Sequence, residues 1–340
     1  MPSKPLHKNI PIFIPHMGCP HCCVFCDQRT ISGHSDFHLE DVKREIETAL
    51  ATIRTGAAAE IAYFGGSFTA IDRDLMVNLL DLAQSYVDAE QVSGIRFSTR
   101  PDAVGEDILD ILSHYTITAV ELGLQSMDDA VLTLCRRGHT VAQAQDACRR
   151  IVARGYPLVG QMMIGLPGST CESEMATAKR ICELGATAAR VYPTVVFDGT
   201  ALAAWMKNGE YLPLTNDIAA ERSARVLDIF EQRGVDVLRV GLCASDGLSS
   251  DAAIGGANHP ALGEMAYSAL FRMRMEQALK ASRIEVRDRK VTIFVPRGKI
   301  SQAIGQHRTN AVWLMETFGG LRVNIKESDQ LTGTQVALSE

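Results

Sequence analysis

The chain has 340 residues, 46% of them hydrophobic, and a formal net charge of -6 at pH 7. This length is enough to bury a full-sized core and suggests about two domains. The opening MPSKPLHKN lacks the layout of a secretory signal, and no stretch approaches the roughly 18 consecutive apolar residues of a membrane span. These features argue against a membrane protein and predict a globular protein of the cytoplasm.

The first predicted element is a short apolar strand over residues 9–15, and four of the nine cysteines follow it in HMGCPHCCVFCDQR, residues 16–29. Cytosolic thiols stay reduced and nine is an odd number, so we expect no disulfide framework. The cluster is therefore predicted to bind a metal or to act in redox chemistry. The remaining cysteines stand singly and are expected to be small buried side chains; they are Cys135, Cys148, Cys171, Cys182 and Cys243.

The spacing within the cluster separates the possible kinds of site. Structural zinc usually needs a second pair of cysteines or a pair of histidines at fixed spacing, and the chain offers neither. Cys19 and Cys22 form C-x-x-C, which suits a thioredoxin-like pair where it opens a helix. Cys19, Cys23 and Cys26 form C-x-x-x-C-x-x-C, and three soft thiolates in a loop suit an iron-sulfur cubane that keeps one iron without a protein ligand.

Strands and helices alternate along the chain after the cysteine loop. Strands are predicted within residues 60–67, 94–102, 118–126, 158–168 and 188–197, and helices within 38–53, 72–87, 105–115, 128–138, 141–155 and 171–185. Such alternation implies right-handed crossovers and a parallel sheet. Six units by Phe197 predict an α/β fold, a partial (βα)6 barrel of the TIM type, whose chemistry lies at the carboxyl ends of the strands.

The cysteine spacing, with the aromatic Phe25 just before the last cysteine, resembles the signature of the radical S-adenosylmethionine (SAM) superfamily. The resemblance implies that Cys19, Cys23 and Cys26 hold a 4Fe-4S cluster whose open iron binds SAM. It also implies reductive cleavage of SAM to a 5'-deoxyadenosyl radical, with electrons from a reductase or a flavodoxin- or ferredoxin-type donor. Cys22 is an alternative to Cys23 as a ligand, but the spacing to Phe25 favours Cys23.

A narrower resemblance runs from about Ile10 to about Ala244. FGGSFTAID, STRPD, VELGLQSMDD, RRGHT and QMMIGLPGST together resemble the radical SAM domain of the Elongator catalytic subunit and its bacterial relatives, and they are also similar to oxygen-independent coproporphyrinogen oxidases. His139 in RRGHT is expected to be a cap or hydrogen-bond partner, and no catalytic residue is assigned. The SAM-binding residues that the resemblance implies are Phe25, Gly65, Gly66, Ser98, Gln125, Arg137 and Gln161.

The pattern changes beyond the barrel. We predict a radical SAM domain over residues 1–244 with a C-terminal extension, a small-residue linker loop over 245–258, and a basic domain over 259–340. From Phe271 to Asn310 there are ten basic and three acidic residues, a local net charge of +7. Such a segment on an acidic protein is a candidate surface for nucleic acid, although solvated faces of an ordinary helix and hairpin give the same count.

The basic domain has a recognisable order of elements. A helix over 260–282, strands over 283–288 and 290–296, a helical stretch over 300–319 and a strand over 321–326 resemble a compact α+β KH domain of the bacterial type. IGQHRTNAVWL lies where such domains place the G-x-x-G loop that clamps a nucleic-acid backbone, with Arg308 in place of the second glycine. This resemblance implies RNA contacts from Lys299, Gly305 and Arg308.

Three functions stay open from the sequence. The first is a radical SAM enzyme acting on RNA, with tRNA the expected substrate and the KH-like domain holding it. The second is a radical SAM enzyme of small-molecule metabolism, with the C-terminal domain used for packing or dimerisation. The third is an RNA-binding iron-sulfur redox sensor. The Elongator subunit also carries an acetyltransferase domain that these residues do not match, so carboxymethylation of wobble uridine is not expected.

Overall fold

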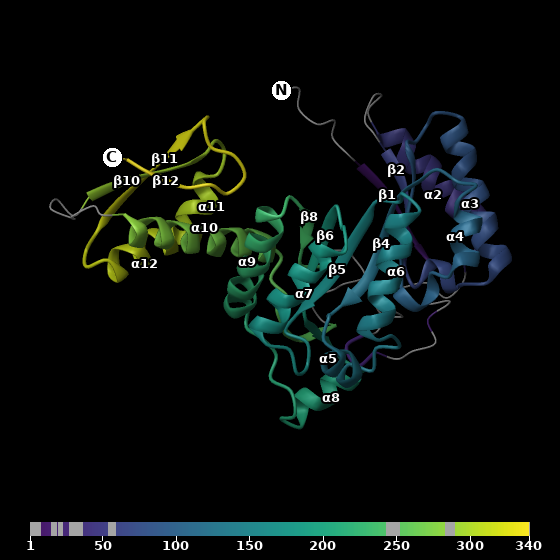
Figure 1. The fold of residues 1–340 in the computed structure, drawn as a ribbon, viewed down its shortest axis with the longest axis horizontal. Helices are drawn as coiled ribbons and strands as arrows, with labels where there is room; N and C mark the ends of the chain where they lie inside the picture. The colour runs from purple at the N-terminus through teal and green to yellow at the C-terminus, as the bar shows by residue number, and fades with distance from the viewer. Residues whose placement is uncertain are drawn as a thin grey trace.

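The computed structural model describes residues 8–14, 19, 23–26, 37–53, 59–242, 252–282 and 290–339. In these ranges a seven-stranded parallel sheet, in the order β1-β2-β3-β4-β5-β6-β8, curves into a half-barrel (Figure 1). The predicted partial barrel is confirmed, with β8 as a further strand beyond the six predicted units. Its strands are β1 (Lys8–Ile14), β2 (Ala59–Gly65), β3 (Gly94–Thr99), β4 (Ile117–Gln125), β5 (Leu158–Ile164), β6 (Ala188–Pro193) and β8 (Asp236–Val240).

Helices cover the outer face of the sheet, and α5 and α8 lie beyond the carboxyl ends of the strands (Figure 1). Side-chain caps fix where several helices begin: Asp72 Oδ1 accepts from two backbone N–H groups of α3, and Thr140 and Thr170 form capping boxes at α6 and α7. No helix in the described ranges is long and apolar enough to cross a membrane. The barrel helices are α2 (Leu39–Thr52), α3 (Arg73–Asp88), α4 (Glu106–Leu112), α5 (Asp129–Leu134), α6 (Val141–Ala153), α7 (Cys171–Glu183), α8 (Ala201–Lys207) and α9 (Asn216–Gln232), with 3-10 turns η1 (Phe68–Ala70) and η2 (Pro101–Ala103).

The predicted strand over 188–197 is two strands in the structure. β6 belongs to the barrel, whereas β7 (Val195–Phe197) pairs antiparallel with β9 (Ala253–Gly256). The predicted linker loop 245–258 therefore contains a strand, while residues 245–251 lie outside the described ranges. Gly256 permits this pairing, because its φ is +86° and a Cβ there would stand 2.4 Å from the Thr194 carbonyl oxygen.

The C-terminal domain has a small sheet and a core of its own. The sheet order is β11-β10-β12, with β10 parallel to β11 and antiparallel to β12, and Phe271, Ile293 and Leu314 are fully buried beneath it. The predicted strand over 283–288 lies outside the described residues. The elements are α10 (Leu262–Ala281), β10 (Lys290–Pro296), α11 (Ile300–Ile304), η3 (Gln306–Arg308), α12 (Thr309–Thr317), β11 (Arg322–Ser328) and β12 (Ala337–Leu338).

Helix α10 joins the C-terminal domain to the barrel (Figure 1). One end packs on α9, where Ala266 and Leu270 lie in one buried apolar cluster with residues of α9. Arg274 pairs with Asp228 at 2.7 Å, and Glu231 accepts from Arg274 at 3.3 Å. Charge pairing and apolar packing together fix the direction in which the C-terminal domain leaves the barrel.

Candidate active site

The predicted SAM-binding residues gather at the carboxyl half of neighbouring parallel strands. Gly65 ends β2 and Gly66 follows it, Ser98 lies in β3, and Gln125 ends β4. Gln161 of β5 lies in register with Gly123 of β4. Because parallel strands point the same way, these positions meet at one end of the half-barrel, as the barrel prediction requires.

The two glycines after β2 have different surroundings. Gly65 has a φ of +106°, and a Cβ on it would stand 2.4 Å from the Ile14 carbonyl oxygen of β1. Its lack of a side chain is therefore required by the backbone and by the close approach of β1. Gly66 is half-buried and shows no positive φ, so it is the better candidate for space reserved for a ligand.

The end of β4 is irregular and polar. The ladder with β5 shifts register between Gly123 and Gln125, and Gln125 has a φ of +65°. Gln125 is 6% exposed, and its Oε1 has no hydrogen-bond partner. A Cβ at Gly123 would meet Arg137 Nη2 at 2.9 Å and Gln125 Nε2 at 3.1 Å, so this glycine makes room for both side chains. A strained, unsatisfied amide at a strand end is typical of a binding site.

The described part of the cysteine loop lies against α5 and α8. Val24 N–H donates to the Cys135 carbonyl at 3.2 Å, and Val24 carbonyl accepts from Leu202 N–H at 2.8 Å. Phe25 packs partly buried against the apolar cluster that contains these residues. Cys22, the alternative ligand to Cys23, lies outside the described residues. Of the scattered cysteines, Cys135 and Cys148 are buried as predicted, whereas Cys171 and Cys182 are only partly buried, and Cys243 lies outside the described residues.

Two arginines reach the sulfurs of this loop. Arg100 Nη1 donates to Cys19 Sγ at 3.2 Å, and Arg137 Nη1 donates to Cys23 Sγ at 3.4 Å. Asp102 accepts from two nitrogens of Arg100; burial alone would raise the pKa of this carboxyl, but the Arg100 hydrogen bonds outweigh burial and hold the pKa below its usual range. The predicted SAM residue Arg137 thus meets the cysteine loop, and Arg100 is a site residue that the sequence did not single out.

His139 lies beside the same charged groups. It is 4% exposed, its ring lies near the Leu124 carbonyl, and neither ring nitrogen meets the geometry of a hydrogen bond. Burial, with the charge of Arg137, lowers its pKa to about 4, although Asp102 acts the other way. The imidazole is therefore neutral at pH 7.

Four charged side chains fill the interior of the barrel below the strand ends. Arg96 donates to Glu60 at 2.7 Å and to Glu121 at 3.1 Å, and Arg190 donates to both oxygens of Glu121 at 2.7 and 3.1 Å. Their side chains are 1 to 12% exposed, and their formal charges cancel. The sequence analysis missed this cluster, although single charges inside the apolar strands EIAYF, GIRFS, TAVELG and AARVY were its signal.

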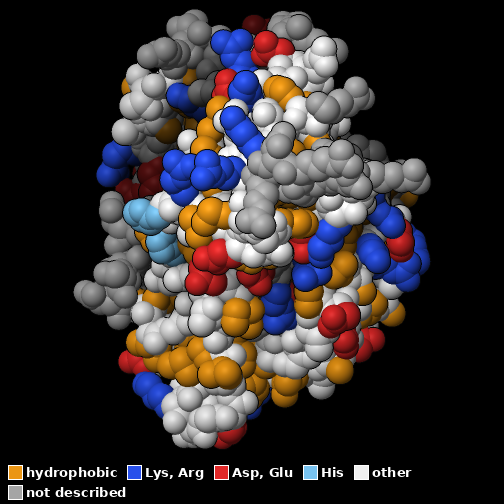
Figure 2. Space-filling model, turned by 90° about the vertical axis from the view of Figure 1, so that its left-hand side faces the viewer, with side chains coloured by type: hydrophobic (Ala, Val, Ile, Leu, Met, Phe, Trp, Pro, Cys, Tyr) orange, Lys and Arg blue, Asp and Glu red, His pale blue; other side chains and the backbone are white. Residues whose placement is uncertain are grey.

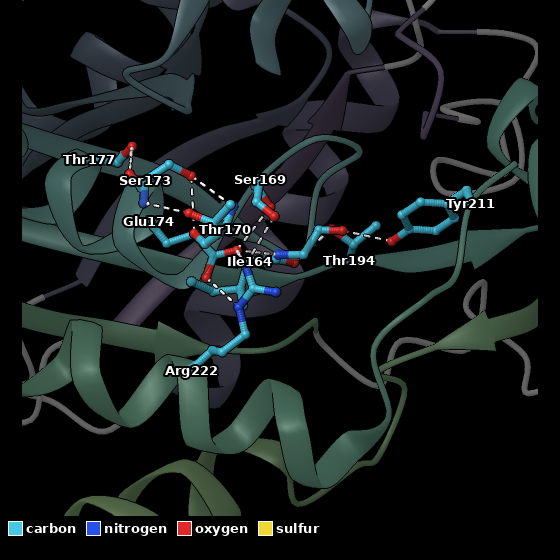
Figure 3. A network of polar contacts seen from close by, with 10 residues as sticks. Ile164, Ser169, Thr170, Ser173, Glu174, Thr177, Thr194, Tyr211 and Arg222 are labelled. Carbon is cyan, nitrogen blue, oxygen red and sulfur yellow. Dashed lines mark hydrogen bonds and ion pairs between the residues drawn. The ribbon is translucent and has the colours of Figure 1, made fainter. Parts of the chain in front are cut away.

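A second polar network holds the IGLPG turn after β5 (Figure 3). Glu174 of α7 accepts from Gly165 N–H at 2.6 Å and from Ser169 Oγ at 3.0 Å, and it pairs with Arg222 of α9 at 2.6 and 2.7 Å. Tyr211 O–H donates to the Gly165 carbonyl at 2.7 Å. The turn that follows Gln161 is thereby fixed by two helices and a loop.

The side chains at the strand ends and in the cysteine loop suit the 4Fe-4S cluster and the SAM molecule that the family resemblance implies. Cys19, Cys23 and Cys26 carry thiols with two guanidinium donors beside them, and the orphaned Gln125 Oε1 and Arg137 Nε call for a polar ligand. Among the described residues, no three His, Cys, Asp or Glu side chains stand at metal-binding spacing. The ligand role of the three cysteines therefore stays a prediction from their order in the chain.

Comparisons with known proteins agree with this reading of the fold. The family model of the radical SAM superfamily matches residues 13–181, and the model of the Radical_SAM C-terminal domain matches residues 186–272. An uncharacterized protein of Methanocaldococcus jannaschii is 31% identical over 218 residues, which cover 61% of this chain and 66% of that protein. A tRNA uridine(34) acetyltransferase of the same organism is 30% identical over 182 residues, 48% of this chain and 34% of the relative.

The fold also matches solved structures. Elp3 of the archaeon Methanocaldococcus infernus superposes with a TM-score of 0.62 at 22% identity, covering 81% of this chain and 64% of that chain. SuiB of Streptococcus suis, bound to S-adenosylmethionine, has a TM-score of 0.50 at 16% identity, covering 70% of this chain and 51% of that chain. In each of these comparisons the chain spans less than two thirds of the other protein. The chain belongs to the radical SAM superfamily, whose enzymes use a 4Fe-4S cluster and S-adenosylmethionine.

Proposed function

We propose that this radical SAM enzyme modifies RNA, with tRNA as its substrate class, and that residues 259–340 form a KH-like domain that holds the RNA. The observation that carries the proposal is the GQHR loop, residues 305–308, which connects α11 to α12 in the C-terminal domain. An RNA-holding module attached to a radical SAM barrel would bring one nucleotide of a long substrate to the strand ends.

The backbone of the GQHR loop is unusual, and its last residue is an exposed cation. Gly305, His307 and Arg308 all have positive φ, at +81°, +50° and +63°. Glycine is favoured at position 305, because its φ of +81° is one that side chains rarely adopt and a Cβ there would stand 2.5 Å from Thr309 Oγ1 and 3.2 Å from the Asn310 backbone nitrogen. Arg308 is exposed and has no ion-pair partner among the described residues, so its charge is available to phosphate.

Part of the basic segment is paired with acidic side chains, which reduces the charge that it offers to RNA. Arg272 pairs with Glu221 at 2.6 Å and Arg274 with Asp228, so these α10 arginines are paired with carboxylates of α9. Lys280 pairs with Glu276 on its own helix. On the face of the molecule in Figure 2, Lys and Arg side chains form separate groups with hydrophobic and acidic side chains between them.

Lys299 remains a candidate RNA contact beside the loop. Its ammonium lies 5.8 Å from the centre of the Tyr267 ring, and Lys299 immediately precedes α11. Lys299 thus lies at the start of α11, and Arg308 ends the loop that follows α11. The relatives named tRNA uridine(34) acetyltransferases support RNA as the substrate class.

In the barrel, the chain's own residues would hold the cofactors at the strand ends. With both cofactors bound, the chemistry supplied is a 5'-deoxyadenosyl radical. Gly123 keeps open the space in which Gln125 and Arg137 lie, and the Glu174 network keeps the turn after β5 in place. The proposed cluster ligands are Cys19, Cys23 and Cys26, and the proposed SAM contacts are Phe25, Gly65, Gly66, Ser98, Gln125, Arg137 and Gln161.

The test is anaerobic incubation of reconstituted protein with SAM, dithionite and total tRNA, followed by mass spectrometry of the nucleosides. A new modified nucleoside that depends on SAM is the expected result. Binding is measured in parallel at several salt concentrations. Arg308→Ala should weaken tRNA binding and reduce the slope of log K against log salt by about 0.7 to 0.9, the value for one lost phosphate contact.

Arg322→Ala is the matched control for this binding test. Arg322 is an exposed arginine at the start of β11 in the C-terminal domain. It lies in register with Lys290 at the beginning of β10, whereas Lys299 follows the other end of that strand. We expect this variant to bind tRNA as the parent does. If the parent binds no better than an acidic control protein at low salt, and no nucleoside changes, the RNA proposal fails and a small-molecule substrate takes its place.

A further inference from the structure

The side chain of Arg100 stands between a carboxylate and a cysteine of the loop. Its Nε and Nη2 donate to the two oxygens of Asp102 at 2.9 and 2.5 Å, while its Nη1 donates to Cys19 Sγ at 3.2 Å. The Arg100 side chain is 8% exposed and that of Asp102 is 18% exposed. Because two parallel bonds to one carboxylate fix the plane of a guanidinium, Asp102 sets the direction of the N–H group that meets the sulfur.

The backbone around Arg100 is held as firmly as its side chain. Arg100 N–H donates to Ser67 Oγ at 3.2 Å, and that hydroxyl shares a hydrogen bond with Thr99 Oγ1 at 2.9 Å. The segment thus leaves β3 in a direction fixed by the turn after β2. A side chain held at both ends can act on its neighbour without rearrangement.

We propose that Arg100 donates a hydrogen bond to the Cys19 sulfur in the cluster-loaded protein and thereby raises the reduction potential of the cluster. Reduction adds one electron, which an external low-potential reductant supplies, and makes the cluster more negative. A nearby cation and a hydrogen bond to a ligand sulfur both stabilise the more negative state. Arginine keeps its proton throughout, so the effect needs no proton transfer. The inference rests on Cys19 as a cluster ligand and is independent of the substrate.

Arg100 is a cleaner probe of this effect than Arg137. Arg137 also donates to a sulfur, that of Cys23, but its Nη2 is held by the Gly123 carbonyl at 2.7 Å, inside the predicted SAM site. A substitution of Arg137 would change SAM binding and the potential together. Arg100 carries no predicted SAM contact, so its substitution isolates the sulfur interaction.

The experiment is a redox titration of the reconstituted full-length protein without SAM or RNA, followed by the electron paramagnetic resonance signal of the reduced cluster. Arg100→Gln should lower the equilibrium constant for one-electron reduction at least tenfold, which is about 59 mV in midpoint potential. Iron per chain is measured on every sample, so that a change of potential is separated from loss of the cluster.

Arg73→Gln is the matched control, because it also removes one positive charge from the lining of the same cavity. Arg73 lines, with Cys19 and Arg100, a cavity of about 670 Å³, but it pairs with Asp107 at 2.8 Å. We expect this variant to keep the midpoint potential of the parent. A shift as large as that of Arg100→Gln would overturn the inference, because general charge would then explain both.

Arg100→Lys keeps the test decisive if the glutamine variant does not load iron. A lysine retains the charge but lacks the planar fork that meets Asp102 and the sulfur at once, so its midpoint should lie below that of the parent and above that of the glutamine variant. An iron-loaded Arg100→Gln protein with the parent's midpoint contradicts the inference. If Arg100→Gln holds no iron, an iron-loaded Arg100→Lys protein with the parent's midpoint potential also contradicts the inference.

Discussion

Gly65 lies so close to Ile14 of the neighbouring strand that a Cβ on it would stand 2.4 Å from the Ile14 carbonyl oxygen. Gly65 also has a φ of +106°, which side chains rarely adopt. The contact joins the edge strand β1 to β2 directly before the cysteine loop. Gly65, which the family resemblance assigns to SAM binding, therefore also has a structural role.

Gly65→Ala should accordingly lower the free energy of unfolding by about 2 to 3 kcal/mol, the cost of a strained backbone conformation. The measurement is urea unfolding followed by circular dichroism. Gly66→Ala is the control, since Gly66 shows no positive φ and should stay within about 0.5 kcal/mol of the parent. Equal stability of the two variants would contradict the assignment of a backbone role to Gly65.

The cysteine assignment predicts which thiols are needed for the cluster. Alanine in place of Cys19, Cys23 or Cys26 should abolish most of the iron retained after anaerobic reconstitution, because each removes one of three ligands. Cys22→Ala and the control Cys171→Ala should retain iron as the parent does. Loss of the cluster in Cys22→Ala with retention in Cys23→Ala would exchange the two assignments.

The buried imidazole of His139 predicts a loss of stability in acid. Its pKa is about 4 in the folded state and about 6.5 when unfolded, so the unfolded chain binds the proton more readily below pH 6.5. The stability contributed by the neutral ring is complete above pH 6.5 and falls as the pH drops towards 4. Between pH 7 and pH 5 this linkage costs about 2 kcal/mol.

His139→Gln removes that titration and should flatten the decrease between pH 7 and pH 5 by the same amount. Unfolding is measured on protein without a cluster, so that acid lability of the cluster does not enter. His114→Gln, a change at an exposed histidine, should leave the pH profile of the parent unaltered. If the free energy of unfolding falls equally in the parent and in His139→Gln, groups other than His139 cause the loss of stability in acid.

The polar network of Figure 3 predicts that a substitution of Glu174 lowers the stability of the protein strongly. Glu174→Gln leaves Arg222, whose side chain is 16% exposed, without its charge partner, and should cost about 3 kcal/mol of unfolding free energy. Glu183→Gln is the control on the same helix, because its pair with Arg180 is exposed and should contribute less than about 1 kcal/mol. Similar Tm values for the two variants would argue against a structural role for the pair.

The alternation of strands and helices could be predicted from the sequence, because apolar residues recur with a different period in strands than in helices. The strand β8 was not, since DVLRV follows a helix by a short turn and has two charges in five residues. Its place was decided by pairing with β6, and pairing between distant segments leaves no local signal. The same reason accounts for β9, whose partner β7 lies more than fifty residues earlier.

The residue types of the site were predictable, but their partners were not. STRPD shows an arginine and an aspartate after a strand, yet the reach of Arg100 to Cys19, 81 residues away, follows from the parallel order of β1, β2 and β3. Arg308 stood out as a departure from a glycine pattern. Its left-handed backbone, with φ at +63°, could not be read from the letters, because arginine rarely adopts it.

The half-barrel leaves β1 and β8 as its outer strands among the described residues, and an outer strand invites pairing with another molecule. β1 carries Pro11, an exposed residue without a backbone N–H, in the middle of its seven residues. At the other side β8 carries Asp236 and Arg239 on a short, partly exposed strand. Pro11 removes one backbone donor from one border of the open sheet, and Asp236 and Arg239 place charge at the other, and both features disfavour the addition of a strand from another molecule.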